Sequence, residues 1–128
     1  MTARQKVSSG GPWEGRGGYS RAVFMGDSAW VAGTTDAGSD GRSQHPGDIA
    51  AQARAVFAII RTALEQGGFS LNDVVRTRMF LTDITRSAEV NEVHLELFDA
   101  IRPAASMVEV SALIDPSLLI EIEADARR

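Results

Sequence analysis

Carboxylates occupy every second position near the end of the chain, at Glu121, Glu123 and Asp125, and alternate with small or branched apolar residues. Because successive side chains of a strand point to opposite faces, this segment is predicted to be a strand that carries its carboxylates in one row. A carboxylate in a cleft can orient water or accept a proton, whereas the same alternation is also typical of a solvated strand face. Ser106 and Glu109 fall in a second β-favouring run, and the pattern alone leaves a site and a wet surface both open.

The other reactive side chains do not form a recognisable set. The chain has no cysteine, which excludes disulfides, thiolate nucleophiles and thiolate metal sites. His45 and His94 lack the spacing of metal ligands, so we predict no metal and no cofactor. No Ser-His-Asp arrangement can be assembled from residue spacing, and Ser106 is therefore predicted to be a hydroxyl that lines a cleft.

The glycine-rich segment 8–18 resembles a nucleotide-binding loop only in composition. It lacks the GxxxxGK[ST] pattern, and no strand is predicted before it. We predict instead that residues 1–17 form a flexible glycine-rich arm that orders against a neighbouring surface, with Trp13 as its anchor.

Composition and charge narrow the class of protein. The 128 residues carry a formal net charge of -4, which argues against a protein that mainly holds phosphate backbones and makes nucleic acid an unexpected partner. No apolar run follows the first basic residues, so neither a signal peptide nor a membrane span is expected. We expect one cytoplasmic domain over residues 1–128, with a core large enough to fold without disulfides.

Two β-favouring runs, 19–25 and 29–33, begin the predicted fold. The turn residues 26–28 separate them, which predicts a hairpin. A polar loop is expected over residues 34–47.

Two amphipathic helices follow in the prediction. Apolar residues recur at steps of three and four from Ile49 to Leu64, Asp48 suits the first turn, and Gly67 can end the helix. A second helix is predicted over residues 87–100, with His94 at the edge of its apolar stripe.

Three further strands are predicted, over residues 73–83, 103–110 and 118–126. The strands over 103–110 and 118–126 flank a turn at Asp115-Pro116, and Pro103 suits the first position of the strand over 103–110. In the strand over 73–83, successive residues alternate between two faces. One predicted face carries Val75, Thr77, Met79 and Leu81. The other carries Val74, Arg76, Arg78 and Phe80.

The order β-β-α-β-α-β-β predicts an α+β fold with both helices on one face of a mixed sheet. The other face lacks a helix to cover it. Burial by symmetry partners is the natural solution, and we predict a closed oligomer.

Four segments in this order resemble those of the RidA family, also called YjgF or reactive-intermediate deaminases. The resemblance covers roughly residues 17–128, and its last segment is the most specific. The segments are Gly18-Tyr19, Ala50-Ala51-Gln52-Ala53-Arg54, Asp73-Val74-Val75 with Asp83, and Pro103-Ala104-x-Ser106-x-Val108-Glu109-Val110 followed by Ile120-Glu121-Ile122-Glu123-Ala124.

The resemblance implies a homotrimer of chorismate-mutase-like subunits, whose sheets line a central barrel and whose small-molecule clefts lie between subunits. It implies hydrolysis of 2-imino acids to 2-keto acids and ammonia. In that family an arginine in a Pro-Ala-Arg-Ser segment grips the substrate carboxylate, a glutamate positions water, and a tyrosine closes the site.

Carried onto this chain, the resemblance makes Glu121 the catalytic residue and Tyr19 and Asn91 substrate-binding residues. Ala105 occupies the place of the arginine, and Ser106 and Met107 follow it in the substrate-binding segment. A lost bidentate arginine–carboxylate contact costs roughly 2–5 kcal/mol of binding free energy. We therefore expect altered or absent 2-imino acid deamination.

Three functions stay open at this point. The chain is a hydrolase for an imine-like or carbonyl metabolite, a protein that binds a small metabolite without turnover, or an endoribonuclease, which its acidic charge disfavours. Arg102 could replace the missing arginine, but a role as a helix cap or surface ion pair is favoured. Arg76 and Arg78 could do so too, although salt bridges to the carboxylate strand are favoured for both.

Overall fold

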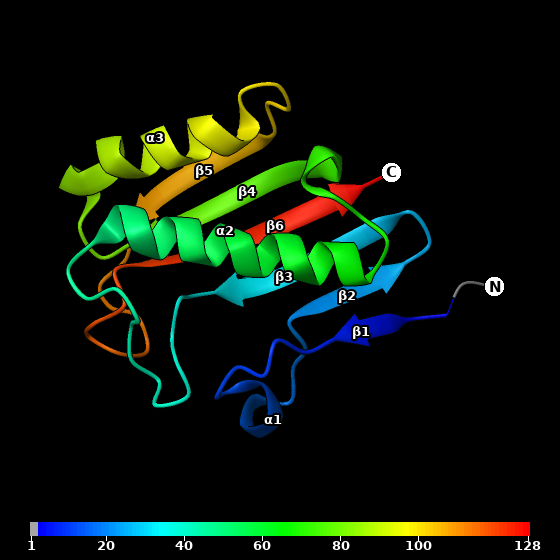
Figure 1. Cartoon of the computed structure of the whole chain (residues 1–128), viewed down its shortest axis with the longest axis horizontal. Helices are drawn as coiled ribbons and strands as arrows, with labels where there is room; N and C mark the ends of the chain where they lie inside the picture. The colour runs from blue at the N-terminus through cyan, green and yellow to red at the C-terminus, as the bar shows by residue number, and fades with distance from the viewer. Residues whose placement is uncertain (1–2) are drawn as a thin grey trace.

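The computed structural model describes residues 3–128 as a six-stranded mixed sheet with two long helices on one face (Figure 1). The strands are β1 (Gln5–Val7), β2 (Ala22–Met25), β3 (Ser28–Thr34), β4 (Val74–Leu81), β5 (Ala104–Glu109) and β6 (Ile120–Arg127). The helices are α1 (Glu14–Gly17), α2 (Ile49–Gln66) and α3 (Ser87–Phe98), with short 3-10 turns η1 (Leu71–Asp73) and η2 (Ile84–Arg86). The predicted α+β class, with both long helices on one sheet face, is confirmed.

The last two strands are not neighbours. The strand order is β1-β2-β3-β6-β4-β5; only β4 and β5 are parallel, and all other pairs are antiparallel. The chain crosses over through α3, which makes β5 parallel to β4. It then returns past β4, so that β6 lies between β4 and β3. Arg78 of β4 pairs with Ser106 on one side and Glu123 on the other, so one strand separates Ser106 from the carboxylate row.

A bulge in β4 corrects the predicted assignment of its faces. Val74 pairs with Ala126 and Arg76 pairs with Asp125, which leaves Val75 as an additional residue. Val74 is consequently buried on the helix side, whereas Val75 is 47% exposed. The strict two-residue period fails only at this position.

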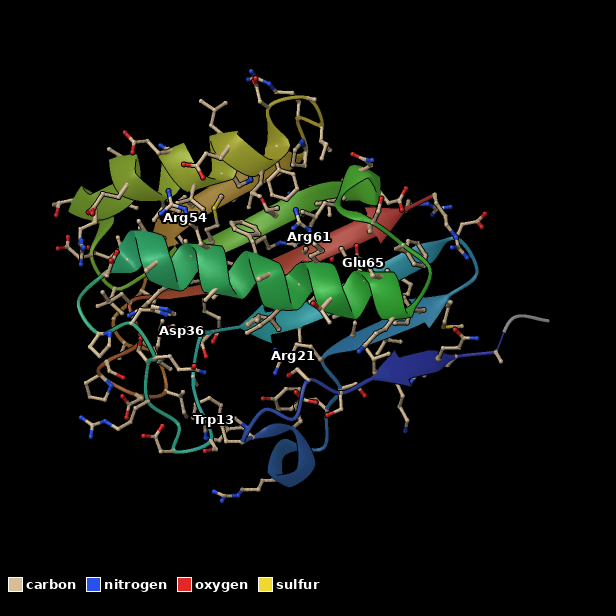
Figure 2. All side chains as sticks on the ribbon, viewed as in Figure 1. Trp13, Arg21, Asp36, Arg54, Arg61 and Glu65 are labelled. Atoms are coloured by element: carbon tan, nitrogen blue, oxygen red, sulfur yellow. The ribbon has the colours of Figure 1, made fainter. Side chains whose placement is uncertain are left out.

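The glycine-rich N-terminal segment contains more regular structure than predicted. A strand does precede the glycines, because β1 pairs with β2 in antiparallel register, and α1 follows them. An antiparallel edge strand and a four-residue helix still do not make the parallel strand-loop-helix unit that binds nucleotides. Trp13 packs against Gly41 of the loop after β3, and Figure 2 shows it between the two segments.

The core lies between the sheet and α2 and α3. Asp48 caps α2 as predicted, since its side chain accepts a hydrogen bond from Ala51 N. The fully buried Gln52 amide donates to the carbonyl oxygens of His45 and Ser117 and accepts from Leu119 N, which ties two loops to α2. Within residues 3–128, no helix is long and apolar enough to cross a bilayer.

His94 provides a test of this core. Its Nε2 lies 2.9 Å from Thr77 Oγ1, and its ring packs against Phe57 and Phe98. Burial lowers the pKa of His94, so the unfolded chain binds the additional proton. The free energy of unfolding should therefore be highest above about pH 6.5 and should fall as pH drops toward 5. Denaturant unfolding between these values measures the effect.

The matched variant is His94→Phe, which keeps an aromatic ring in the cluster and removes the titration. Its unfolding free energy should change less with pH over this window, and a slope equal to that of the wild type would contradict the assignment.

Candidate functional site

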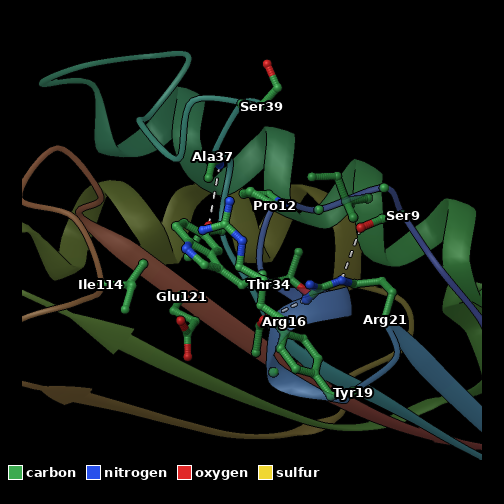
Figure 3. Close-up of a pocket in the computed structure, with 18 of the residues that line it drawn as sticks. Ser9, Pro12, Arg16, Tyr19, Arg21, Thr34, Ala37, Ser39, Ile114 and Glu121 are labelled. Atoms are coloured by element: carbon green, nitrogen blue, oxygen red, sulfur yellow. Dashed lines mark hydrogen bonds between the residues drawn. The ribbon is translucent and has the colours of Figure 1, made fainter.

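A pocket of about 650 Å³ opens where the N-terminal segment meets the end of β3 (Figure 3). Its walls come from the glycine-rich segment with α1, from β3 and the loop after it, from α2, and from β6. Its lining residues include Ser9, Pro12, Trp13, Arg16, Tyr19, Arg21, Gly33, Thr34, Gln44, Ile59, Ile114 and Glu121.

Glu121 enters this pocket over Gly33. A Cβ atom on Gly33 would lie 2.5 Å from Glu121 Oε2 and 2.9 Å from its Cδ, so only glycine leaves room for the carboxylate in this position. The register of β3 against β6 shifts between Val31 and Thr34, which places Gly33 at the irregularity. The backbone of β3 therefore sets where the carboxylate lies.

The environment of Glu121 raises the proton affinity of its carboxylate. Burial raises the pKa of this carboxyl, the negative charge of Glu123 raises it further, and the positive charge of Arg21 opposes both. A carboxylate with raised proton affinity is suited to accept a proton from a bound water molecule near neutral pH.

A buried ion pair holds the wall beside Glu121. Arg21 Nη2 lies 3.3 Å from Glu14 Oε2, and both side chains are less than a tenth exposed. Arg21 Nη1 donates to Gly33 O at 2.7 Å and to Thr34 Oγ1 at 3.0 Å, while the Ser9 hydroxyl donates to Glu14 at 2.6 Å. The pair thus ties the N-terminal segment to the end of β3.

Burial alone would raise the pKa of Glu14. Hydrogen bonds from Ser9 and its neighbours, together with the charge of Arg21, outweigh burial and hold the pKa below its ordinary range. Glu14 is therefore ionised at neutral pH, and the pair carries its full charge.

Tyr19 forms the side of the pocket next to Arg21. Tyr19 is 41% exposed, and the centroid of its ring lies 5.7 Å from the Arg21 guanidinium carbon. Gly18 ends α1 at φ 72°, a left-handed conformation that turns the chain into this position.

The loop after β3 is shaped by a buried carboxylate. Asp36 Oδ2 accepts from the Ser43 hydroxyl at 2.9 Å and lies 3.0 Å from His45 Nδ1. These contacts fold the loop back on itself, so that its backbone faces the glycine-rich segment across the pocket. Within residues 3–128, no three His, Asp or Glu side chains cluster in a way that could hold a metal ion.

The structure brings together two of the residues that the sequence singled out, Tyr19 and Glu121. Asn91 instead lines a shallow depression beside α3 with His94, Phe98 and Arg102.

The three predicted residues of β5 also lie outside the pocket. Ala105 and Met107 pair with Thr77 and Met79 on the helix side, whereas Ser106 pairs with Arg78 on the opposite side. Strand alternation thus places Ser106 on the opposite sheet face from Ala105 and Met107.

Two of the three other charged candidates, Arg78 and Arg102, form ion pairs at the surface, whereas Arg76, for which a salt bridge was also favoured, forms none within residues 3–128. Arg78 lies 3.6 Å from Glu123 and 3.3 Å from Asp125, as predicted for a salt bridge to the carboxylate strand. Arg102 Nε donates to Asp99 O at 2.8 Å, which agrees with a cap at the end of α3.

The sequence analysis missed most residues that line this pocket, among them Arg16, Arg21 and Gly33, and it missed Glu14 in the supporting wall. Only Arg21 carried a signal, as a cation within a β-favouring run; the contact that makes it part of the wall comes from a residue seven positions earlier.

Known proteins resemble this chain over most of its length. A family model described as Endoribonuclease L-PSP matches residues 13–128. The structure is similar to that of a member of the YjgF/YER057c/UK114 family from Mycobacterium tuberculosis, with 53% identity, a TM-score of 0.89, and coverage of 98% of this chain and 100% of that one.

Two further proteins extend the comparison. The YjgF gene product of Escherichia coli is 32% identical, with a TM-score of 0.76 and coverage of 86% of this chain and 87% of that one. A RutC family protein of Pyrococcus horikoshii is 40% identical over 110 residues, which are 86% of each chain.

Proposed function

The chain belongs to the endoribonuclease L-PSP family, also known as YjgF/RidA, and from this premise we propose that it directs water onto the electrophilic carbon of a small imine-like or carbonyl metabolite, with hydrolysis of a C=N bond as the leading case. The observation that carries the proposal is the Glu121 carboxylate, which faces a pocket of about 650 Å³ and has a raised pKa. A pocket of this volume suits a small molecule. Residues 1–128 make up the single RidA-like domain that performs the reaction.

In the proposed reaction on an imine, Glu121 orients a water molecule against the electrophilic carbon. The water oxygen bonds to this carbon, Glu121 takes one water proton, and the C=N electron pair moves to nitrogen, which receives that proton. The C–N bond of the resulting carbinolamine then breaks, the hydroxyl proton reaches nitrogen through Glu121, and ammonia leaves a carbonyl product. The Tyr19 hydroxyl donates a hydrogen bond to the substrate.

We propose a homotrimer for the assembly. Trp30 of β3 and Val108 of β5 are 46% and 47% exposed on the sheet face opposite the helices. Large apolar side chains on a face without a helix favour burial against other copies. In such a trimer the edge strand β5 of one copy approaches the pocket of the next, so that Asn91, Ala105, Ser106 and Met107 complete the neighbouring cleft.

Sedimentation equilibrium at micromolar concentration tests the assembly. A mass of three chains is expected, and a monomer would remove the interfacial cleft from the proposal.

Two assays test the function. 2-Iminobutanoate generated in situ should be converted slowly by the wild type and faster by Ala105→Arg, because the new guanidinium can bind the substrate carboxylate. Rapid conversion by the wild type would show that position 105 is not needed for carboxylate binding.

The second assay uses an imine without a carboxylate next to the reacting carbon. Turnover by the wild type is expected. Saturable binding without turnover of either imine would support a metabolite-binding protein instead. Cleavage of RNA, which the net charge of -4 disfavours, would support the third function.

A further inference from the structure

Three large apolar side chains line the pocket without belonging to the core. Trp13 comes from the glycine-rich segment, Ile59 from α2, and Ile114 from the loop before β6. None of the three is part of the buried core of residues 3–128, and Ile114 is 68% exposed. Apolar surface that several elements present to one cavity, and that no core side chain covers, indicates contact with a ligand.

The size of the pocket indicates a ligand larger than the group that reacts. The cavity holds about 650 Å³, and cavities of roughly 300–1,000 Å³ accommodate ligands of drug size. An imine that carries only short alkyl groups would fill the part of this volume next to Glu121. The remaining volume is available to a further part of the ligand, and the side chains around it determine the chemistry of that part.

The polar groups next to Glu121 are already paired within the protein. Thr34 Oγ1 donates to Ala32 O at 2.7 Å and accepts from Arg21 Nη1 at 3.0 Å, while Arg21 is also held by Glu14. The surface of the pocket as a whole is more apolar than polar. An apolar group of the ligand gains free energy when it leaves water for such a surface, whereas a polar group must find new hydrogen-bond partners.

Trp13 is fixed in position before any ligand binds. Its carbonyl oxygen accepts from Gly17 N at 2.8 Å, which closes the single turn of α1. Its six-membered ring packs on Gly41 of the loop after β3, where a Cβ atom would lie 3.2 Å from Trp13 Cζ2. An aromatic ring that is already fixed loses little conformational freedom when a second ring stacks on it.

We propose that the metabolite carries an aromatic ring, which stacks on Trp13 and contacts Ile59 and Ile114 while Glu121 faces the electrophilic carbon. This inference rests on the proposed function and adds the substrate class, an imine or carbonyl compound that bears a ring. A flat ring suits this surface better than an alkyl group of equal size, because stacking adds attraction beyond the area that the ring buries.

The experiment compares three ketones that share one carbonyl group and differ in the group beside it: phenylacetone, cyclohexylacetone and butanone. Ketones are not hydrolysed, so binding is measured without turnover. Calorimetric titration of the assembled wild-type protein should show phenylacetone binding about 10-fold or more tighter than butanone, since its ring is buried in the pocket. Cyclohexylacetone should bind with an affinity between the two, because it buries similar apolar area without stacking.

Two variants locate the ring. Trp13→Leu keeps an apolar side chain and should weaken binding of phenylacetone about 5- to 20-fold, and of cyclohexylacetone less. Ile114→Ala should weaken binding of both about 3-fold and leave butanone unchanged. Because Ile114 lies outside the core, this second variant should fold as the wild type does.

The matched control is Val75→Ala. Val75 is an exposed apolar residue of β4, at 47%, and it does not line this pocket. Its replacement also removes a small amount of exposed apolar surface, and all three affinities should stay unchanged.

Tryptophan fluorescence reports the contact directly, because emission depends on the surroundings of the indole. The chain has two tryptophans, Trp13 and Trp30, and Trp30 does not line this pocket. In Trp30→Phe the emission comes from Trp13 alone and should change over the phenylacetone concentrations at which calorimetry detects binding. Trp13→Leu retains only Trp30, and its emission should not change.

Equal affinities of the wild type for the three ketones, an unchanged emission of Trp13, or equal effects of Ile114→Ala and Val75→Ala would each overturn the inference. A lower assembled mass of Ile114→Ala with unchanged affinity for phenylacetone would overturn it too, because a second copy of the chain would then cover Ile114. Failure of the proposed function looks different: phenylacetone would still bind at Trp13, but no imine would be hydrolysed. Equal turnover of imines with and without a ring would reject the ring and retain the hydrolysis.

Discussion

Glu121→Gln is expected to lower kcat/KM for imine hydrolysis by about 10²–10⁴-fold, the range that a positioned general base contributes. The amide keeps the size of the side chain but cannot take a proton from water. The unfolding free energy should not fall, because burial disfavours the ionised carboxylate that the substitution removes. Steady-state kinetics on the assembled protein, with denaturant unfolding in parallel, measures both quantities.

Glu123→Gln is the matched control on the same strand. Glu123 is paired with Arg78 and does not line the pocket, so turnover should persist. Its charge is one of the causes that raise the pKa of Glu121. The acid limb of the pH profile of kcat/KM should therefore move to lower pH in this variant. Loss of turnover in Glu123→Gln, or full turnover in Glu121→Gln, would contradict the assignment of the base.

Gly33→Ala tests whether the position of the Glu121 carboxylate matters, because the variant keeps this carboxylate but displaces it. The new methyl group would meet the end of the Glu121 side chain, which is flexible and can move away at little cost in stability. Catalysis requires the carboxylate to lie within hydrogen-bond reach of the water. We expect a reduced kcat with the unfolding free energy nearly preserved, whereas an unchanged kcat would mean that the position over Gly33 is unimportant.

Local periodicity accounts for the parts of this fold that were predicted. The apolar stripe of α2 and the alternation of β6 each bury one face of a regular element, and a single period describes such an element. The hairpin of β2 and β3 follows from its turn residues in the same way. Predictions from one sequence succeed where the physical cause lies within the segment itself.

The misses have causes that are distant in sequence or that interrupt a period. The bulge at Val75 breaks the alternation without any glycine or proline to mark it. The place of β6 between β3 and β4 depends on strand pairing over the whole chain. β1 has only three residues, too few to show a period.

The pocket residues likewise divide into those with a local sequence signal and those positioned by residues distant in sequence. Glu121 and Tyr19 were found through motifs, whereas the ion pair of Glu14 with Arg21 joins a helical turn to a strand start and has no signature in sequence. Arg16 was missed for the same reason, since α1 owes its position to that pair.

Glu14→Ala is expected to lower the free energy of unfolding by about 3 kcal/mol, toward the low end of the range for breaking a buried ion pair. The loss arises because Arg21 would remain buried with its charge uncompensated. Its hydrogen bonds to Gly33 O and Thr34 Oγ1 remain, which limits the cost. Denaturant unfolding at neutral pH measures the change.

The pH dependence identifies the mechanism. The pKa of Glu14 is depressed in the folded protein, so its contribution is fully present above the ordinary glutamate pKa of about 4.3 and is lost as pH falls through the depressed value. The difference between the wild type and Glu14→Ala should therefore shrink in acid. A difference that stays constant down to low pH would mean that packing rather than charge explains the loss.

Glu96→Ala is the contrasting control, because its ion pair with Arg54 is shorter, at 2.9 Å, yet more than half exposed on both sides. Little change in unfolding free energy is expected, since water screens exposed pairs. Equal losses in the two variants would show that burial does not decide the strength of these pairs.

The double variant Glu14→Leu/Arg21→Met tests whether the ion pair contributes to the free energy of unfolding or to the properties of the pocket. Apolar residues of similar volume replace a buried ion pair at little or no cost, so much of the stability lost in Glu14→Ala should return. The charge of Arg21 would still be missing beside Glu121, and the pKa of Glu121 should rise further, which moves the acid limb of catalysis to higher pH. A stable protein with a displaced pH profile would show that the pair matters more for the charge that Arg21 places beside Glu121 than for the stability it adds.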